Sequence, residues 1–125
     1  FQRLLDKNGP AYIPHYKLTP DEVVSLIHRS GGLAVLAHPG LIGDDTLVQE
    51  LLELRMDGIE AIHPAHSKLQ MSQYEQVAKR RGLLVTGGSD FHGLPGRFPD
   101  SLGLFTVPQR LADSLREAAR RQGMK

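Results

Sequence analysis

The fold is decided by the stretch Leu83-Leu84-Val85-Thr86-Gly87-Gly88-Ser89-Asp90-Phe91-His92-Gly93, in which an apolar run leads into a glycine-rich polar turn. A short apolar run bounded by glycines is typical of a strand covered on both faces. Asp90 and His92 are two residues apart, so extended backbone would point both side chains to the same side. Carboxylate and imidazole together suit Zn, Mn or Fe. The stretch therefore predicts a strand followed by a turn that can bind a metal ion.

The same strand-and-turn unit occurs twice upstream, each time after a segment with helical periodicity. Residues 33–37 lead into His38-Pro39-Gly40, and residues 59–62 lead into His63-Pro64-Ala65-His66. A further apolar run at 103–107 predicts a fourth strand, and the intervening helices are expected at about 19–30, 45–56, 69–81 and from 108 onward. Alternating strands and helices imply parallel strands joined by right-handed crossovers. We therefore predict an α/β fold with about four parallel strands.

Local signals support the helix boundaries. Thr19 and Glu22 form a potential capping box around Pro20, and Asp44 or Asp45 is expected to cap the second helix. The basic run 79–81 is interpreted as a solvated helix end, because cations there complement the helix dipole. A short helix is also expected at 2–6.

Composition limits the class of protein. The 125 residues suit a single domain, 1–125, and 40% hydrophobic with 23% charged residues is an ordinary globular balance. A net charge of +1 gives no electrostatic reason to expect nucleic acid or an anionic membrane as an obligatory partner. The chain has no cysteine, so any metal must use His, Asp, Glu and water. No apolar run approaches the roughly 20 residues of a membrane span. We expect a cytoplasmic protein, with Phe1 either internal to a longer chain or exposed by removal of a leader.

Potential ligands gather at the ends of the predicted strands. The carboxyl ends of parallel strands meet at one edge, which is where active sites of such folds lie. Five residues fall there, on three successive loops: His38, His63, His66, Asp90 and His92. This arrangement predicts a metal site built from loops. His15 and His28 lie elsewhere and are interpreted as ordinary polar positions. Glu60 could support a ligand or pair with a helix cation, and we favour an ordinary structural role for it.

The three strand-and-turn segments that contain these residues resemble the C-terminal half of the PHP (polymerase and histidinol phosphatase) family. The resemblance is closest to bacterial phosphoesterases that act on nucleotides and short nucleic acids. It extends upstream to residues 9–14 and to the predicted helix at 19–32. The segments that carry it are Ala37-His38-Pro39-Gly40, Gly58-Ile59-Glu60-Ala61-Ile62-His63-Pro64-Ala65-His66 and Thr86-Gly87-Gly88-Ser89-Asp90-Phe91-His92-Gly93.

The resemblance implies a distorted (β/α)7 barrel, of which this chain would be the C-terminal portion. It also implies two or three divalent ions (Mn, Zn or Fe) at the rim of the full-length protein. Carried over by position, the metal ligands are His38, Asp90 and His92. The family's first motif, a His-x-His, does not occur in this chain. The fragment alone is therefore expected to be a poor catalyst and to self-associate through its exposed sheet edges.

The implied reaction is metal-dependent hydrolysis of a phosphate ester, in a nucleotide or a short nucleic acid. Two ions would activate a bridging water and clamp the phosphoryl oxygens. Asp90 would accept a proton, and His66 would protonate the departing alkoxide. Candidate substrate contacts are His63, Lys68, Arg97 and the backbone amides near Gly87 and Gly88. Two alternatives stay open: an amidohydrolase-like hydrolase of C–N bonds, and a non-catalytic module without metal.

Overall fold

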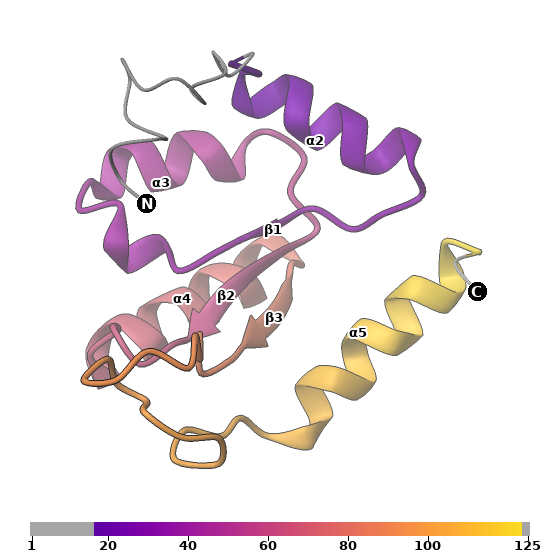
Figure 1. The fold of residues 1–125 in the computed structure, drawn as a ribbon. Helices are drawn as coiled ribbons and strands as arrows, with labels where there is room; N and C mark the ends of the chain where they lie inside the picture. Colours follow the sequence, from indigo (N-terminus) through magenta and orange to yellow (C-terminus); the bar gives the residue numbers. More distant parts are fainter. Residues whose placement is uncertain (1–16, 124–125) are drawn as a thin grey trace, which may run out of the picture.

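The computed structural model describes residues 17–123, which form a parallel sheet packed between helices (Figure 1). The predicted helix at 2–6, the segment 9–14 and His15 lie outside the described residues. In chain order the elements are α2 (Pro20–Arg29), β1 (Val35–Leu36), η1 (Pro39–Leu41), α3 (Asp45–Leu52), β2 (Gly58–Ile62), α4 (Lys68–Arg81), β3 (Leu84–Gly87) and α5 (Gln109–Arg121). The prediction of an α/β fold with parallel strands is confirmed.

β2 is the central strand and anchors the core. It pairs in parallel with β1 on one side and with β3 on the other. Ile59 and Ala61, which alternate onto one face of β2, are fully buried. Gly58 allows close approach of β3, since a Cβ there would lie 3.0 Å from the carbonyl oxygen of Leu84. The core cluster is completed from α3 and α4 by Val48, Leu52, Tyr74, Val77 and Ala78.

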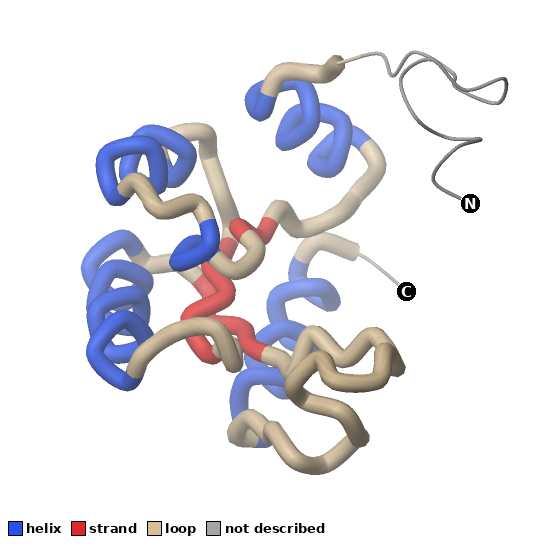
Figure 2. Tube along the Cα trace, turned by 60° about the vertical axis from the view of Figure 1, so that its left-hand side comes forward, coloured by secondary structure: helices blue, strands red, loops and turns tan. Residues whose placement is uncertain are grey.

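The helices cover the sheet in two groups. In Figure 2 the strands run between α3 and α4 on one side and α5 on the other. α5 buries Leu111 and borders the end of β3 together with Val107. A Cβ at Gly87 would lie only 3.0 Å from Cγ1 of Val107, so this glycine lets the segment before α5 approach β3. The end of β3, from which Asp90 follows, is thus fixed by packing.

Helix starts follow the capping signals of the sequence. Thr19 and Glu22 form the predicted capping box of α2. Asp44, rather than Asp45, caps α3 by accepting hydrogen bonds from the first-turn amides. Ser67 caps α4 in a second capping box, with Gln70. Each cap satisfies backbone N–H groups that a helix leaves free at its start.

Two predicted elements differ from the structure. The fourth strand at 103–107 is not formed: Gly103 adopts φ +90°, Leu104 is exposed, and Val107 packs beside the end of β3 without pairing with it. An apolar run becomes a strand only where a neighbouring ladder can accept its backbone bonds, and here α5 packs on β3 instead. The second helix ends at Leu52 rather than near Met56, and Arg55 then turns the chain with φ +57°.

The described residues therefore contain a three-stranded parallel sheet, and a closed barrel is not formed by them. On its outer side β1 borders a hollow lined largely by apolar side chains of α2, β1, the end of α3 and the turn after it, among them Val23, Leu36 and Met56. Self-association through such an edge stays a prediction. Within residues 17–123, no helix has the length and apolar character needed to cross a membrane.

Candidate active site

The loops that follow the three strands meet at one end of the sheet and bring three histidine rings together. The rings of His38, after β1, and His63, after β2, have centroids 5.5 Å apart. The ring of His66 lies 5.3 Å from that of His63 and 5.1 Å from the ring of Tyr74 on α4. His63 Nε2 in turn lies 3.7 Å from Oδ2 of Asp90, after β3. Side chains from all three predicted loops thus occupy one region.

Two residues of this region have a backbone conformation that L-residues rarely adopt. His38 has φ +29° and Asp90 has φ +49°. Such conformations persist only where the surroundings impose them, and they cluster at functional sites. For His38 the support is Glu60 of β2, whose Oε2 accepts the His38 amide hydrogen at 2.8 Å. Glu60 therefore contacts the site directly and supports a predicted ligand, rather than pairing with a helix cation.

His66 is a buried structural histidine in this arrangement. Its Nδ1 lies 2.9 Å from the carbonyl oxygen of Ala61 and must donate, while its Nε2 accepts from the amide of Gly40 at 3.1 Å. Neither ring nitrogen is left to deliver a proton, so the predicted role in protonating the leaving group does not fit this geometry. His66 instead ties η1 to the end of β2. Gly40 is required for this, because a Cβ there would lie 2.6 Å from His66 Cδ2.

His63 has the opposite character, since one of its ring nitrogens is left without a partner. Its Nδ1 accepts from the amide of Ala65 at 3.1 Å, which assigns the ring hydrogen to Nε2. That Nε2 is buried and has no hydrogen-bond partner in the described structure. Burial lowers the pKa of His63 below its usual value, against the opposing effect of the Glu60 carboxylate. The side chain is a neutral donor held beside Asp90.

Asp90 is surrounded by nitrogen groups. Arg97 Nη2 donates to its Oδ2 at 2.8 Å, and His92 Nδ1 lies 3.8 Å from its Oδ1. His92 Nδ1 also lies 2.5 Å from the backbone carbonyl oxygen of Asp90. That bond leaves Nε2 as the free nitrogen, which is the usual arrangement of a histidine ligand. Asp90, His63 and Arg97 line a cavity of about 320 Å³, to which Leu41, Ser89 and Phe98 also contribute.

The three predicted metal ligands are not on adjacent loops. Asp90 and His92 follow β3 and have the right donor chemistry, whereas His38 follows β1, on the far side of the central strand β2. In residues 17–123, however, no group of three or more His, Asp or Glu side chains is arranged to hold a metal ion. The nearest cationic group to Asp90 is Arg97 of the chain itself. His38, Asp90 and His92 therefore do not form a complete metal site by themselves.

Two predicted phosphate contacts are not favoured by the structure. The amide of Gly88 donates to the carbonyl oxygen of Ile62 at 3.0 Å, because the ladder between β2 and β3 continues past β3, so this amide is not free to bind phosphate. Lys68 is the first residue of α4, is exposed, and does not line the Asp90 cavity. Arg97 and His63 do line it. No sequence signal indicated that Leu41 and Phe98 line the cavity.

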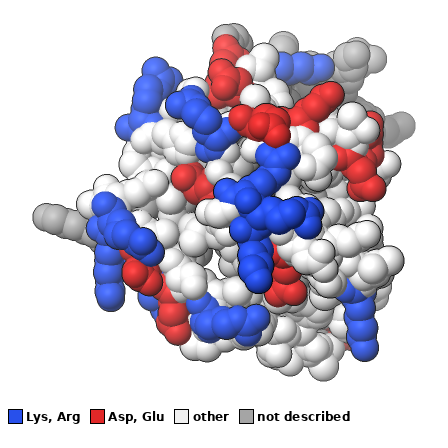
Figure 3. All heavy atoms as spheres, turned by 180° about the vertical axis from the view of Figure 1, so that it is seen from behind, with Lys and Arg blue, Asp and Glu red and all other residues white. Residues whose placement is uncertain are grey.

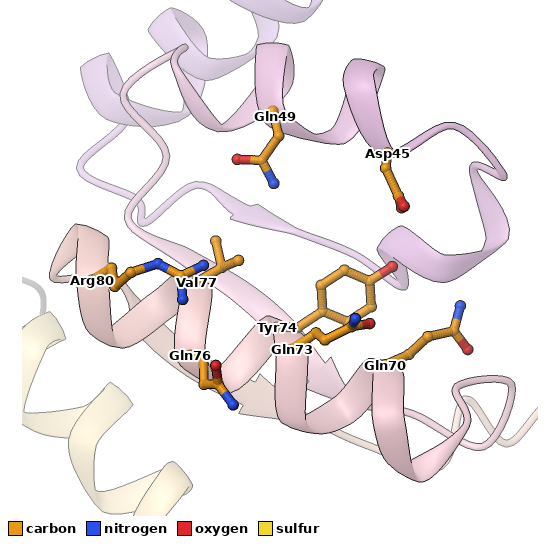
Figure 4. A pocket seen from close by; sticks show the side chains of 8 residues that line it. All are labelled: Asp45, Gln49, Gln70, Gln73, Tyr74, Gln76, Val77 and Arg80. Carbon is orange, nitrogen blue, oxygen red and sulfur yellow. The ribbon is translucent and has the colours of Figure 1, made fainter.

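A second cavity, of about 290 Å³, lies on the outer side between α3 and α4 (Figure 4). Its lining includes Asp45, Tyr74, Arg80 and four glutamines, and none of the residues predicted for the site. Burial raises the pKa of Tyr74, and the Asp45 carboxylate adds to this effect. On the face shown in Figure 3, Lys and Arg side chains gather near the centre with Asp and Glu around them. Because the cavity between α3 and α4 contains none of the predicted site residues, the Asp90 cavity is the stronger candidate site.

Comparison with known proteins gives several phosphoesterases as relatives, among them three from different bacteria. The chain is 42% identical over 78 residues to a phosphoribosyl 1,2-cyclic phosphate 1,2-diphosphodiesterase of Eggerthella lenta (62% of this chain, 30% of that protein). It is 34% identical over 101 residues to a 3′,5′-nucleoside bisphosphate phosphatase of Chromobacterium violaceum (77% and 35%). It is 32% identical over 97 residues to a 5′-3′ exoribonuclease of Escherichia coli (74% and 33%). The chain thus spans about a third of the length of these relatives.

Two solved structures share the fold. One, from Bifidobacterium adolescentis, is classed as a metal-dependent phosphoesterase; it has a TM-score of 0.63 and 28% identity, with 89% of this chain and 40% of that chain covered. The other is an amidohydrolase from Chromobacterium violaceum with bound sulfate and no metal, with a TM-score of 0.62, 28% identity, and 94% and 42% covered. No protein-family model matches the chain. The resemblance to phosphoesterases expected from the sequence is confirmed.

Proposed function

We propose that this chain, homologous to about a third of several phosphoesterases, forms part of a metal-dependent enzyme that hydrolyses phosphate esters of nucleotides or short nucleic acids. The observation that carries the proposal is the Asp90 cavity. A buried donor without a partner, His63 Nε2, and the guanidinium of Arg97 border the same space. Both groups are suited to an anionic, oxygen-rich ligand. The names of the relatives then favour phosphate over other anions.

Phosphate recognition follows from the donors of this cavity. The Nε2–H of His63 would donate to a phosphoryl oxygen and so satisfy a buried polar atom that otherwise has no partner. Arg97 has five N–H donors in a planar fork, which matches two phosphoryl oxygens at once. Among residues 17–123, its one side-chain hydrogen bond is from Nη2 to Asp90. Leu41 and Phe98 supply apolar walls of the cavity.

Other residues of the site hold the loops around His63 and Arg97 in place. His66 fixes η1 through the amide of Gly40, and Glu60 fixes His38 through its amide. We therefore assign His66 a positioning role in place of proton donation. Asp90 stays the proposed catalytic carboxylate, since its charge faces both His63 and Arg97.

The proposed metal dependence rests on the relatives. The proposal includes two or three divalent ions, which are Mn, Zn or Fe. His38, Asp90 and His92 would be contributions of this chain, with further donors needed from outside residues 17–123. A divalent ion in such a site supplies a Lewis acid and an activated water. A cytoplasmic location remains a prediction from the sequence.

The test compares phosphate release with ammonia release by the full-length protein in the presence of Mn²⁺. Substrates are a 3′,5′-nucleoside bisphosphate, followed by release of inorganic phosphate, a short RNA, followed by the mononucleotides that phosphodiester hydrolysis releases, and a set of primary amides, followed by release of ammonia. We expect phosphate release, reduced at least about 100-fold in Asp90→Asn, where the isosteric amide removes the charge. Ammonia release without phosphate release would favour the amidohydrolase alternative, which the sulfate-bound structural neighbour keeps open. Neither product would favour a non-catalytic module.

A further inference from the structure

The Asp90 cavity combines a buried polar group with exposed apolar side chains. His63 is 3% exposed, and its Nε2 has no hydrogen-bond partner among the described residues. Phe98 and Leu41, which line the same cavity from two different loops, are 63% and 58% exposed. A single exposed apolar side chain is ordinary. Two of them around a cavity that contains a buried donor match the lining of small-molecule sites, which are mostly apolar with a few placed polar groups.

Phe98 follows a tight turn in the segment between β3 and α5, which is orange in Figure 1. The turn is Leu94-Pro95-Gly96-Arg97, and the Arg97 amide donates to the carbonyl oxygen of Leu94 at 3.2 Å. Proline and glycine at the two central positions, with Gly96 at φ +78°, are typical of a type II turn. Pro99, directly after Phe98, is buried. The backbone is therefore held on both sides of Phe98 while its ring stays exposed.

Arg97 and Phe98 bring a charge and an aromatic ring to one cavity. The half-exposed guanidinium of Arg97 has N–H donors for an anion, and its charge offsets that of Asp90 at 2.8 Å. The ring of Phe98 has a flat apolar face on which a planar heterocycle can stack. The volume of about 320 Å³ lies at the lower end of the range for ligand sites, about 300–1,000 Å³. The ligand that fits is small, anionic at one end and planar at the other, which describes a nucleoside monophosphate.

We propose that Phe98 is the stacking platform for the nucleobase of the substrate, with Leu41 as the second apolar wall, and that it makes the cavity select nucleotides over sugar phosphates. The inference rests on the proposed function, because that function supplies the phosphate group bound by His63 and Arg97. It goes further by assigning base recognition to one side chain. Since every nucleobase has an aromatic face, stacking is tolerant of base identity, and the cavity should accept both purine and pyrimidine nucleotides.

The test measures binding of adenosine 5′-monophosphate and of ribose 5-phosphate to the full-length protein by isothermal titration calorimetry. The two ligands share the phosphate and the sugar, so the ratio of their affinities isolates the contribution of the base. The proteins are wild type, Phe98→Leu, which keeps an apolar side chain without the aromatic face, and Phe98→Tyr, which keeps that face. Phe105→Leu is the matched control, because Phe105 lies in the same segment between β3 and α5 and does not line the Asp90 cavity. We expect wild type to bind the nucleotide about 5- to 100-fold more tightly than the sugar phosphate, the usual effect of stacking one base on an aromatic ring.

Phe98→Leu should weaken nucleotide binding about fivefold or more and leave the affinity for ribose 5-phosphate within about twofold of wild type. Phe98→Tyr should retain the nucleotide affinity, and Phe105→Leu should leave both affinities unchanged. Equal affinities of wild type for the two ligands overturn the proposal, as does an undetectable affinity for the nucleotide. A loss shared by both ligands in Phe98→Leu, or an equal loss in Phe105→Leu, also overturns it, because the ring would then have only a structural role.

The proposed function is tested separately, by phosphate release from a 3′,5′-nucleoside bisphosphate with Mn²⁺ added to the same protein preparations. Phosphate release together with equal affinities for the nucleotide and the sugar phosphate would overturn the assignment of Phe98 while the proposed function holds. A base-dependent affinity that Phe98→Leu abolishes, without phosphate release, would overturn the proposed function and support the assignment of Phe98.

Discussion

Gly40→Ala is expected to destabilise the chain by displacing His66, although the change adds only one methyl group. The new Cβ would lie 2.6 Å from His66 Cδ2 and 3.0 Å from its Nε2, and His66 is buried and held at its other nitrogen by Ala61. Overpacking of a buried site costs about 1–3 kcal/mol. Loss of the bond from the Gly40 amide to His66 adds about 0.5–1.5 kcal/mol. Alanine also lowers the conformational entropy of the unfolded chain, which stabilises the folded state by roughly 0.4–1 kcal/mol.

The expected loss in the free energy of unfolding is therefore about 0.5–4 kcal/mol, measured by urea denaturation with the slope m unchanged. Gly88→Ala is the matched control. A Cβ there would meet only Glu60 Oε1, at 3.8 Å, so its effect should stay within about 0.5 kcal/mol. His66→Ala combined with Gly40→Ala should show strong coupling, since the small side chain removes the clash. A change below about 0.5 kcal/mol in Gly40→Ala would refute the assignment of His66 as a buried strut for η1.

Three further outcomes are expected. Ser67→Ala removes the N-cap of α4 and should cost about 1 kcal/mol in the free energy of unfolding; an unchanged urea midpoint would contradict the capping geometry. Asp57→Ala should cost about 1–3 kcal/mol, because its Oδ2 accepts both from the Ala34 amide at 2.7 Å and from His28 Nε2 at 2.8 Å. Tyr74 keeps its proton longer in the folded state, since its pKa is raised above 10.0, so it contributes stability that falls as pH rises through and beyond 10. Tyr74→Phe should remove that part of the alkaline loss, and parallel stability–pH curves for the two proteins would rule it out.

Local signals predicted the parts of the fold that local physics decides. The capping box at Thr19 and the cap at Asp44 lie within a few residues of the amides they satisfy, so the sequence pattern contains the whole interaction. The apolar run at 103–107 resembled a strand for the same local reason. Whether it pairs depends on α5, which packs against β3 in its place.

The same distinction between local and long-range interactions applies to the candidate site. That three loops meet at one end of the sheet follows from parallel strands alone, and His38, His63 and Asp90 lie there. The partners of individual side chains do not follow, because they are distant in sequence: Glu60 holds the amide of His38, and Gly40 holds His66, across 22 and 26 positions. For this reason the sequence predicted proton donation by His66 and favoured an ordinary structural role for Glu60 over support of a ligand.

The most direct measurement is a crystal structure of the full-length protein with Mn²⁺ and inorganic phosphate. The account predicts phosphate in the Asp90 cavity, with its oxygens at about 2.7–3.2 Å from His63 Nε2 and from the guanidinium of Arg97. Phosphate bound elsewhere, for example beside Arg80 in the cavity between α3 and α4, with the Asp90 cavity empty, would contradict the central claim.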